Sequence, residues 1–574
     1  MNTRLIRVAA VTLWLAAGIA RAAEPPADLV VLGAAIATLD PARPQATALA
    51  VRGDRIVAVG SDAEIAPFVG PGTRRLEAGG RRVVPGFIEG HGHFMSLGES
   101  LGTLDLRGAE RWEDIVAQVK AAAATTAPGT WIVGRGWHQE KWRGLPADAV
   151  GGVPTNAALN AVAPLHPVAL EHASGHGVIV NAAALALAGI DASAADPTGG
   201  QIVRDARGTP TGWLVDTAAD PVYAAQQRAL AALPAAEQRR LQVEQVRRAG
   251  QEALAKGVTT FHDAGASFAT IDLYRELAEA GELPIRLYAM VGGESNERLA
   301  RDLPRYRLVG HANHFLTVRA IKRMVDGALG SRSAWLLEPY TDAPDSTGLV
   351  VDSLETIERT AELALASGYQ LNTHAIGDRA NREILDLYER AQRGRDGRAL
   401  RWRIEHAQHL HPTDVPRFAK LGVIAAMQGV HASSDGLWVP KRLGEPRAGE
   451  RTYVWRSLID SGALVGNGTD VPVEDIDPLA SFRASVTREM VNGQRFHPEQ
   501  CMTRQEALAS YTWNNAYAGF EEDLKGSLAP GKLADFVVID RDILRVPDAE
   551  LASAKVLHTV LAGRVVYSRA PQAP

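Results

Sequence analysis

The feature that most constrains this chain is an apolar run, Val83 to Phe94, that stops at two histidines on either side of one glycine. The run is typical of a buried strand, and the glycines beside His91 let the backbone turn where the strand ends. In an extended segment, residues i and i+2 point the same way, so His91 and His93 can face one point. The pattern predicts a metal site at the end of the strand. Two ordinary surface or core histidines are the alternative.

Further short apolar runs follow at intervals suited to a (β/α)8 barrel, and most come after a helical pattern that ends in glycine. With Val83 to His93 as the first, the predicted strands are Val258 to His262, Ile285 to Val291, Ala320 to Val325, Gln370 to His374, Trp402 to His406, Val423 to Gln428 and Ala463 to Asp470. Eight such units predict an α/β protein with a TIM-like barrel. The active sites of such barrels lie at the C-terminal ends of the strands.

Side chains able to hold a metal stand on five of these strands. They are His91, His93, Lys322, His374, His406 and Asp470. Four imidazoles and a carboxylate suit Zn²⁺, with Mn²⁺, Co²⁺, Ni²⁺ or Fe²⁺ as alternatives that the sequence does not separate. A lysine ammonium cannot ligate a cation. Lys322 therefore joins the site only as a carbamate formed with CO₂, bridging two ions, or else is an ordinary ion-paired lysine, so one or two ions per chain are both open.

Two bridged ions predict hydrolytic chemistry. A water between them would lose its proton near neutral pH, and the bridging hydroxide would attack a carbonyl polarised by one metal. Asp470 is then expected to accept the proton of that water and deliver it to the leaving nitrogen, as general base and then general acid. The predicted reaction is hydrolysis of an amide-like bond in a small molecule.

The length of 574 residues exceeds a barrel of about 250 residues, so the chain needs additional parts. Short strand patterns in residues 24–82 and 527–570 predict a small composite β-sandwich domain from both termini, with separate terminal hairpins as the alternative. Residues 83–526 form the predicted barrel domain. An insertion of about residues 97–256 follows its first strand and closes with a helix from Pro234 to Lys256, with Gly257 as its cap.

The N-terminus resembles a secretory signal. Arg4 and Arg7 precede an apolar segment, Val8 to Ile19, which is followed by the small-residue pattern Ala20-Arg21-Ala22. The apolar segment is shorter than the roughly 20 residues that span a bilayer. Cleavage after Ala22 or Ala23 is expected, which predicts signal residues 1–22, a periplasmic location and no transmembrane span in the mature chain. An uncleaved anchor is the alternative.

Composition excludes several classes. A net charge of −5 without charged tails gives no electrostatic case for nucleic-acid binding. The single cysteine, Cys501, excludes an intramolecular disulfide and a thiolate metal cluster. Helix signals are clear at two further places. Asp352 with Glu355 predicts a capping box, and Thr503 with Glu506 predicts a second box, opening a helix from Arg504 to Glu522.

Six segments carry a family resemblance. They are Pro85 to His93, Lys322 with Asp326 to Arg332, His374 to Ala380, Arg403 to Gln408, Gly468 to Asp470 and Gly526 to Asp535. Together they resemble the amidohydrolase superfamily, specifically the amidohydrolase-3 or YtcJ-like group that includes N-substituted formamide deformylase. The resemblance covers nearly the whole mature chain. It implies metal ligation by the four histidines and Asp470, with Lys322 as the carboxylated bridge, and it makes a homodimer an open alternative to a monomer.

The sequence departs from the family pattern at three places. Glu89 stands where aspartate is commoner, Thr469 where serine is, and Gly429 where proline is usual. None of these removes a ligand, so they bear on substrate fit. Outside the ligands, Asp326 and Arg332 are expected to hold a substrate carboxylate or a loop.

Several histidines lie outside the predicted ligand set. His176 in the insertion is expected to polarise a carbonyl or line the pocket, against a structural role, and His262 to lie behind the ligands. We expect His409, His411 and His431 to face solvent.

Three alternatives to a hydrolase of C–N bonds stay open. A mononuclear metal deaminase would use the histidines and Asp470 while Lys322 is only structural. A catalytically inactive barrel would serve as a periplasmic binding protein. Esterase or lactonase activity would use the same hydroxide.

Overall fold

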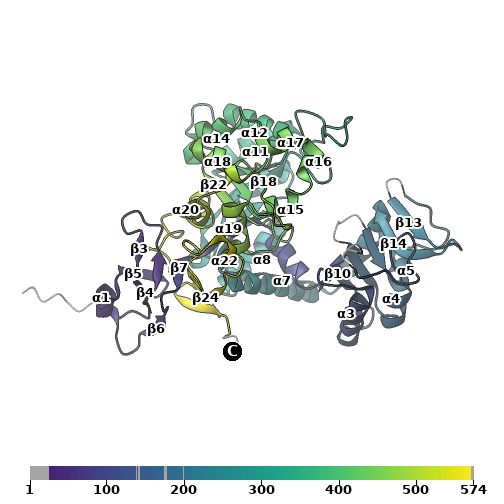
Figure 1. Ribbon diagram of the computed structural model, residues 1–574, viewed down its shortest axis with the longest axis horizontal. Helices are drawn as coiled ribbons and strands as arrows, with labels where there is room; N and C mark the ends of the chain where they lie inside the picture. Colours follow the sequence, from purple (N-terminus) through teal and green to yellow (C-terminus); the bar gives the residue numbers. More distant parts are fainter. Residues whose placement is uncertain (1–24, 138, 140–141, 173–176, 198–199, 571–574) are drawn as a thin grey trace, which may run out of the picture.

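The computed structural model describes residues 25–137, 139, 142–172, 177–197 and 200–570. Its strands form four sheets: a barrel, two sheets built by the chain ends, and one in the insertion. Figure 1 shows the barrel in the middle, with the N-terminal strands on one side and the insertion projecting on the other. The predicted signal peptide lies outside the described residues. None of the described helices combines the length and apolar character that a bilayer crossing requires.

Eight parallel strands form a nearly closed barrel, as predicted. In order around it they are β8 (Phe87–Gly92), β15 (Val258–Ala266), β16 (Arg286–Val291), β18 (Leu316–Met324), β19 (Gln370–Ala375), β20 (Arg403–His406), β21 (Ile424–Gln428) and β22 (Val465–Gly468). A short strand, β17 (Leu308–Gly310), adds to β18 in the antiparallel sense. Most residues of the eight are buried because helices cover the outside of the barrel, which explains their near-continuous apolar character.

The first predicted strand is in fact two strands. β7 (Arg82–Pro85) belongs to a terminal sheet, where it pairs with β23 (Phe536–Ile539) in the antiparallel sense, and only β8 belongs to the barrel. The break falls at Gly86, where a Cβ atom would lie 2.2 Å from Oγ1 of Thr259. A continuous apolar run therefore hid a change of sheet.

The barrel closes between β8 and β22 through side chains. Asn515 on α21 (Trp513–Ala518) donates to the carbonyls of Ile88 and Asn467, both at 2.8 Å. Nearer the strand ends, Glu89 accepts from the backbone N–H of Thr469 at 2.6 Å. Gly468 has to be glycine, since a Cβ atom would lie 2.5 Å from Oε1 of Glu89. These contacts set His91 opposite Asp470.

Helices alternate with the barrel strands. The main ones are α2 (Phe94–Ser100), α7 (Ala235–Ala255), α8 (Phe268–Glu279), α9 (Asn296–Tyr306), α11 (Leu354–Ser367), α12 (Asp378–Ala391), α14 (Val415–Leu421), α18 (Trp455–Asp460), α19 (Pro478–Thr487) and α20 (Arg504–Ser510). The long loop after β21 carries α15 (His431–Asp435), α16 (Val439–Leu443) and α17 (Glu445–Arg451).

Two predicted helix features need correction. The cap of α11 is Ser353, whose side chain accepts from the N–H of Thr356, and not Asp352. The predicted helix Arg504 to Glu522 is two helices, α20 and α21, because the chain turns between Ser510 and Trp513. The capping box of Thr503 with Glu506 is confirmed.

The chain ends build two further sheets, one from N-terminal strands alone and one from strands of both ends. One sheet has the order β5 (Arg55–Gly60), β4 (Ala48–Arg52), β1 (Leu29–Leu32) and β6 (Arg74–Glu77). The other has the order β25 (Arg564–Ser568), β24 (Val556–Leu561), β23, β7, β2 (Ala35–Ala37) and β3 (Gln45–Ala46). One hydrophobic cluster joins them, with Val31 and Leu49 from the first and Val83 and Phe536 from the second. The pairing of β7 with β23 thus brings strands from both chain ends into one sheet.

The insertion has a sheet of its own. Its order is β13 (Gly200–Arg204), β14 (Pro210–Asp216), β12 (Gly177–Val180), β11 (Val168–His172), β10 (Ile132–Trp137) and β9 (Leu104–Asp105). The helices α3 (Trp112–Thr125), α4 (Ala157–Val162), α5 (Ala182–Ala188) and α6 (Asp220–Ala231) pack on it around two cores of their own. The chain returns through α7, after which Gly257 takes a φ of 82°. The predicted closing helix thus matches α7.

Candidate metal centre

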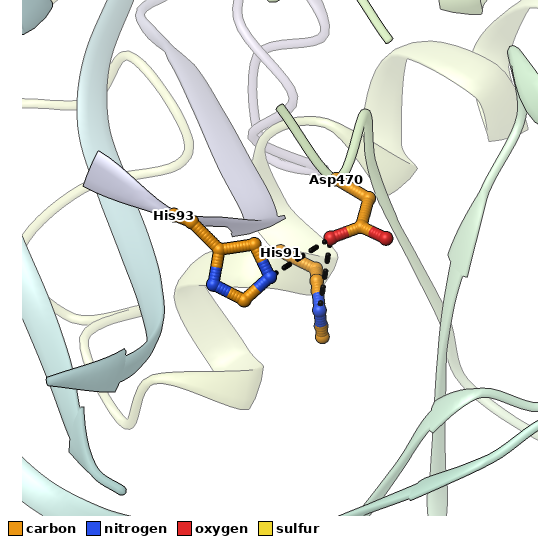
Figure 2. Close-up of side chains that lie close together, drawn as sticks. All are labelled: His91, His93 and Asp470. Carbon is orange, nitrogen blue, oxygen red and sulfur yellow. Dashed lines mark ion pairs between the residues drawn. The ribbon is translucent and has the colours of Figure 1, made fainter. Parts of the chain in front are cut away.

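Three of the predicted ligands meet at the end of the barrel's first and last strands. Nε2 of His93 lies 3.2 Å from Oδ1 of Asp470, and Nε2 of His91 lies 3.4 Å from the same oxygen. One ligand atom from each residue falls within 4.8 Å of the others. Figure 2 shows both imidazoles turned toward the carboxylate. His91 is on β8, His93 comes directly after it, and Asp470 follows β22.

The other three predicted ligands adjoin this group. Nζ of Lys322 on β18 lies 3.4 Å from Nε2 of His91. The ring of His406 at the end of β20 is centred 4.8 Å from that of His91, and the ring of His374 on β19 is centred 4.4 Å from that of His406. All six side chains therefore gather at one end of the barrel.

Two of the six residues have a backbone conformation that is uncommon for residues other than glycine. His406 has a φ of 76° and Asp470 a φ of 57°, both in the left-handed region. On β20, Arg403 and Glu405 both bond inside the barrel, so simple alternation would turn His406 away from it. The left-handed turn brings His406 in. Such conformations cost about 1–3 kcal/mol each and persist where surrounding structure holds them.

The buried imidazoles are held in the neutral form. Burial and the charge of Lys322 lower the pKa of His91 to about 4 and that of His374 to about 3. Burial and His374 lower the pKa of His406 well below its usual value. Neutral imidazole is the form that ligates a metal, so these residues are ready to bind one at neutral pH.

The pKa values of Lys322 and Asp470 are both lowered, which favours a neutral amine on the first and an anion on the second. Burial lowers the pKa of Lys322, which favours the neutral amine that reacts with CO₂. Burial alone would raise the pKa of Asp470, but the hydrogen bond from His93 and the nearby His91 bring it well below its usual value. Asp470 is therefore an anion at neutral pH.

The donor atoms fit a divalent metal. Nε2 of His374 is buried without a hydrogen-bond partner, and an unsatisfied buried polar atom needs an explanation. The Nδ1 atoms of two other histidines are already engaged, that of His91 by Glu405 and that of His406 by Gln428 at 2.8 Å. Their Nε2 atoms are left for a ligand. A set of imidazole nitrogens and a carboxylate oxygen suits Zn²⁺.

Sequence comparison places this site in a known family. The sequence model of the amidohydrolase family, Amidohydro_3, matches residues 76–567. The chain belongs to the amidohydrolase family. The resemblance predicted from the motifs is thereby confirmed.

Individual relatives of this amidohydrolase span nearly its whole length. Protein LONG AFTER FAR-RED 3 from Arabidopsis thaliana is 35% identical over 553 residues, covering 94% of this chain and 92% of that protein. N-substituted formamide deformylase from Arthrobacter pascens is 29% identical over 547 residues, covering 94% and 98%. An uncharacterized metal-dependent hydrolase from Pyrococcus furiosus has a crystal structure that superposes with a TM-score of 0.72 at 27% identity, covering 90% of this chain and 100% of that one.

Asp326 in this amidohydrolase lies beside His374, on the side of its Nε2 atom. Its side chain is fully buried and accepts from the backbone N–H groups of Trp335, Ile376 and Gly377 at 2.8–2.9 Å. Oδ1 lies 3.6 Å from Nε2 of His374. Burial raises the pKa of Asp326 to about 7. Of the two roles predicted for Asp326, these contacts favour holding a loop over contacting a substrate.

The structure bears differently on the substrate roles predicted for Arg332 and His176. Arg332 lies in the loop after β18 and pairs with Asp342 at 2.9 Å, with its side chain 40% exposed. Arg442 pairs with the same carboxylate. A substrate contact by Arg332 stays a prediction. His176 lies outside the described residues.

Sequence reasoning missed several buried groups near the site. His431 and His409, expected to face solvent, are 7% and 1% exposed, and His431 lies 3.2 Å from the carbonyl of Thr469. Glu405 beside His91 was also missed. The alternation of Arg403 and Glu405 before His406 was the available signal, because it turns both charged side chains into the barrel. His262 is buried, and Arg403 connects it to Glu405 behind His91.

Proposed function

We propose that this protein is a metal-dependent hydrolase of C–N bonds other than peptide bonds, acting on a small amide, N-acyl, formamide or carbamate compound. The observation that carries the proposal is the meeting of four histidines, Asp470 and a buried lysine at one end of the barrel. The similarity to N-substituted formamide deformylase supports the bond type.

Two ions would divide these residues between them. His91, His93 and Asp470 would hold one divalent ion, of which Zn²⁺ is the first choice. His374 and His406 would hold a second, with Lys322 bridging both after reaction of its amine with CO₂. Bound ions of this class polarise a carbonyl and lower the pKa of water.

Asp470 moves the proton. It is an anion beside His93 and His91, so it can take the proton of the attacking water as that water adds to the carbonyl carbon. It then gives the same proton to the nitrogen as the C–N bond breaks. The products are an amine and a carboxylic acid, or an amine and a carbonic acid half-ester where the substrate is a carbamate.

One ion is the specific alternative. Within the described part of the chain, His91, His93 and Asp470 have ligand atoms within 4.8 Å of one another, and three ligands suffice for a catalytic zinc. In that case Lys322 would be only structural and the reaction would be a deamination. Release of ammonia, in place of a substituted amine and an acid, would identify it.

The decisive test compares turnover with metal content. Metal-replete protein, chelated protein and the D470N variant are assayed on a panel of formamides, N-acyl amines and carbamates. We expect turnover only with metal, and a loss of about 10²–10⁴-fold in kcat for D470N. The matched control is D523N, an exposed carboxylate after α21, which should keep full activity. Tight ligand binding without turnover in the metal-replete protein would instead favour a binding barrel.

We also propose export to the periplasm, on the signal-like pattern of residues 1–22. N-terminal sequencing of the protein made in its host tests this. A mature N-terminus at residue 23 or 24 supports export, and an intact Met1 contradicts it.

A further inference from the structure

Glu405 lies directly behind His91, on the side away from Asp470. Its carboxylate is fully buried, and Oε2 contacts Nδ1 of His91 while Nε2 of His91 faces Asp470. Glu405 comes from β20 and His91 from β8, and these strands are not neighbours in the barrel. The contact therefore crosses the barrel interior.

Arg403 holds this carboxylate in place. Its Nη2 donates to Oε2 of Glu405 at 2.9 Å and to the carbonyl of Gly90 at 2.7 Å. Its Nε lies 2.6 Å from Oε1 of Glu405, and its Nη1 lies 3.0 Å from Nδ1 of His262. One guanidinium thus ties β20 to β8 and β15. A side chain gripped in this way leaves Glu405 little freedom to turn.

The charge of Glu405 determines which nitrogen of His91 carries the proton. Both oxygens of Glu405 lie against the guanidinium of Arg403, which is always a cation, so the carboxylate is held in its ionised form. An ionised carboxylate only accepts, so His91 donates from Nδ1 and keeps the lone pair of Nε2 toward the site. His406 differs, because its Nδ1 faces the neutral amide of Gln428 at 2.8 Å.

We propose that Glu405, gripped by Arg403, is a positioning residue that fixes the tautomer and the ring orientation of His91 for metal binding. Carboxylates behind ligating histidines raise the basicity of the ligand and fix its orientation, and their loss typically weakens metal affinity 10–100-fold. The inference rests on the proposed metal site and not on the proposed substrate.

The test measures metal binding directly. E405Q keeps the shape of the side chain and removes its charge, so apo E405Q and wild-type protein are compared by chelator competition with Zn²⁺ and by the visible spectrum of the Co²⁺ form. We expect affinity about 10–100-fold weaker in E405Q and an altered Co²⁺ spectrum. R403K, which keeps the cation but not the two-pronged grip, should shift both readouts in the same direction by less.

A second buried glutamate provides the control. Glu521 is 6% exposed and pairs with Lys525 at 2.7 Å, and Thr317 at the start of β18 donates to it, at the opposite end of the strand from the ligands. E521Q should leave metal affinity and the Co²⁺ spectrum unchanged, whatever it does to stability. If E405Q does not fold, E405D and R403K carry the same comparison.

The outcomes separate the inference from the function. Wild-type metal affinity and spectrum in folded E405Q would overturn the role of Glu405 while leaving the hydrolase intact. An equal loss in E521Q would overturn it as well, since the effect would then belong to any buried carboxylate. Failure of the wild-type protein to bind Zn²⁺ or Co²⁺ would remove both the inference and the proposed function.

Discussion

Two residues at the candidate metal centre have backbone conformations that L-residues rarely adopt. His406 and Asp470 both have left-handed backbones, and both are proposed ligands. Backbone strain of this kind clusters at active sites, where neighbouring contacts over-determine it. The hydrogen bond from the N–H of Asp470 to the carbonyl of His91, at 2.8 Å, is one such contact. The strain sets the direction of two side chains that a regular strand would point elsewhere.

Lys322 decides between one ion and two. If its carbamate bridges two ions, K322A should lower the metal content from about two ions per chain to about one and reduce kcat by at least 10²-fold. Elemental analysis of the purified variant, with activity measured on the same sample, checks this. One ion in the wild-type protein, with activity unchanged in K322A, would contradict the bridge. Lys120, on the exposed face of α3, provides a matched control as K120A.

For single residues, the sequence predicted which side chains lie at the site better than it predicted which side chains they contact. The six proposed ligands could be found because each stands on a predicted barrel strand, and such strands bring their C-terminal ends together. The partner of Glu405 could not be predicted. The alternation of side chains along a strand shows that Glu405 points inward, but it does not show which other strand Glu405 contacts. Asp326 is similar: its three amide partners lie in loops whose course no local pattern reveals.

Among the elements, the seam between β8 and β22 depends most on a single side chain. Asn515 is 2% exposed and satisfies two backbone carbonyls. N515L would fill the same space and leave both carbonyls without a donor, so we expect a loss of about 2–4 kcal/mol in the free energy of unfolding. Denaturant-induced unfolding measures it. N492L, in an exposed loop, should stay within about 0.5 kcal/mol of the wild type.

The cap of α20 should make stability depend on acid. The hydrogen bonds from Arg456, both at 2.8 Å, are the main reason that the pKa of Glu506 falls to about 2. A lowered carboxylate pKa stabilises the fold above its usual value near 4.5 and loses that contribution as the pH falls toward 2. Because this carboxylate is 30% exposed, E506Q should cost about 1–2 kcal/mol at pH 7.

The pH series gives the check on Glu506. Urea unfolding of E506Q and wild-type protein at pH 7, 5 and 4 should show a difference that is constant above pH 5 and smaller at pH 4. A difference that does not change down to pH 4, or one that grows, would contradict the assigned ion pair.

Strands and helices were predicted correctly where a single physical effect determines the sequence pattern. Buried parallel strands are continuous apolar runs, so the barrel strands could be located within a few residues. The break at Gly86 could not, because the apolar run continues through it and only Thr259, on the next strand, forbids a side chain there. The division of α20 from α21 was missed for a related reason, since the intervening residues carry no glycine or proline.

For the whole molecule, one buried ion pair connects the C-terminal segment to the barrel. Arg286 on β16 and Asp535, just before β23, are joined at 2.7 and 3.1 Å, and both are almost fully buried. Removing one partner leaves an unpaired buried charge, so D535N should cost about 3–5 kcal/mol. Replacing both, as in R286M with D535L, should recover most of that loss. A double variant as unstable as the single one would contradict this account.

The arrangement of the sheets in the whole molecule could be predicted only in part. Short strands with turn residues at both ends of the chain indicated that the termini meet, and β7 pairs with β23 as that idea requires. The insertion gave no comparable signal, because its strands are short and mixed in direction, with helices between them. Its sheet and its two separate cores became evident only in the structure.

The joining of β8 to β22, and of β7 to β23, also bears on how the protein is made. β22, the neighbour of the first barrel strand on one side, begins only at Val465, so it is synthesised long after β8. Contacts between such distant parts of a chain form slowly, and until they form the strand keeps an open edge. During that interval a nascent chain of this kind depends on whatever shields exposed strands in the cell.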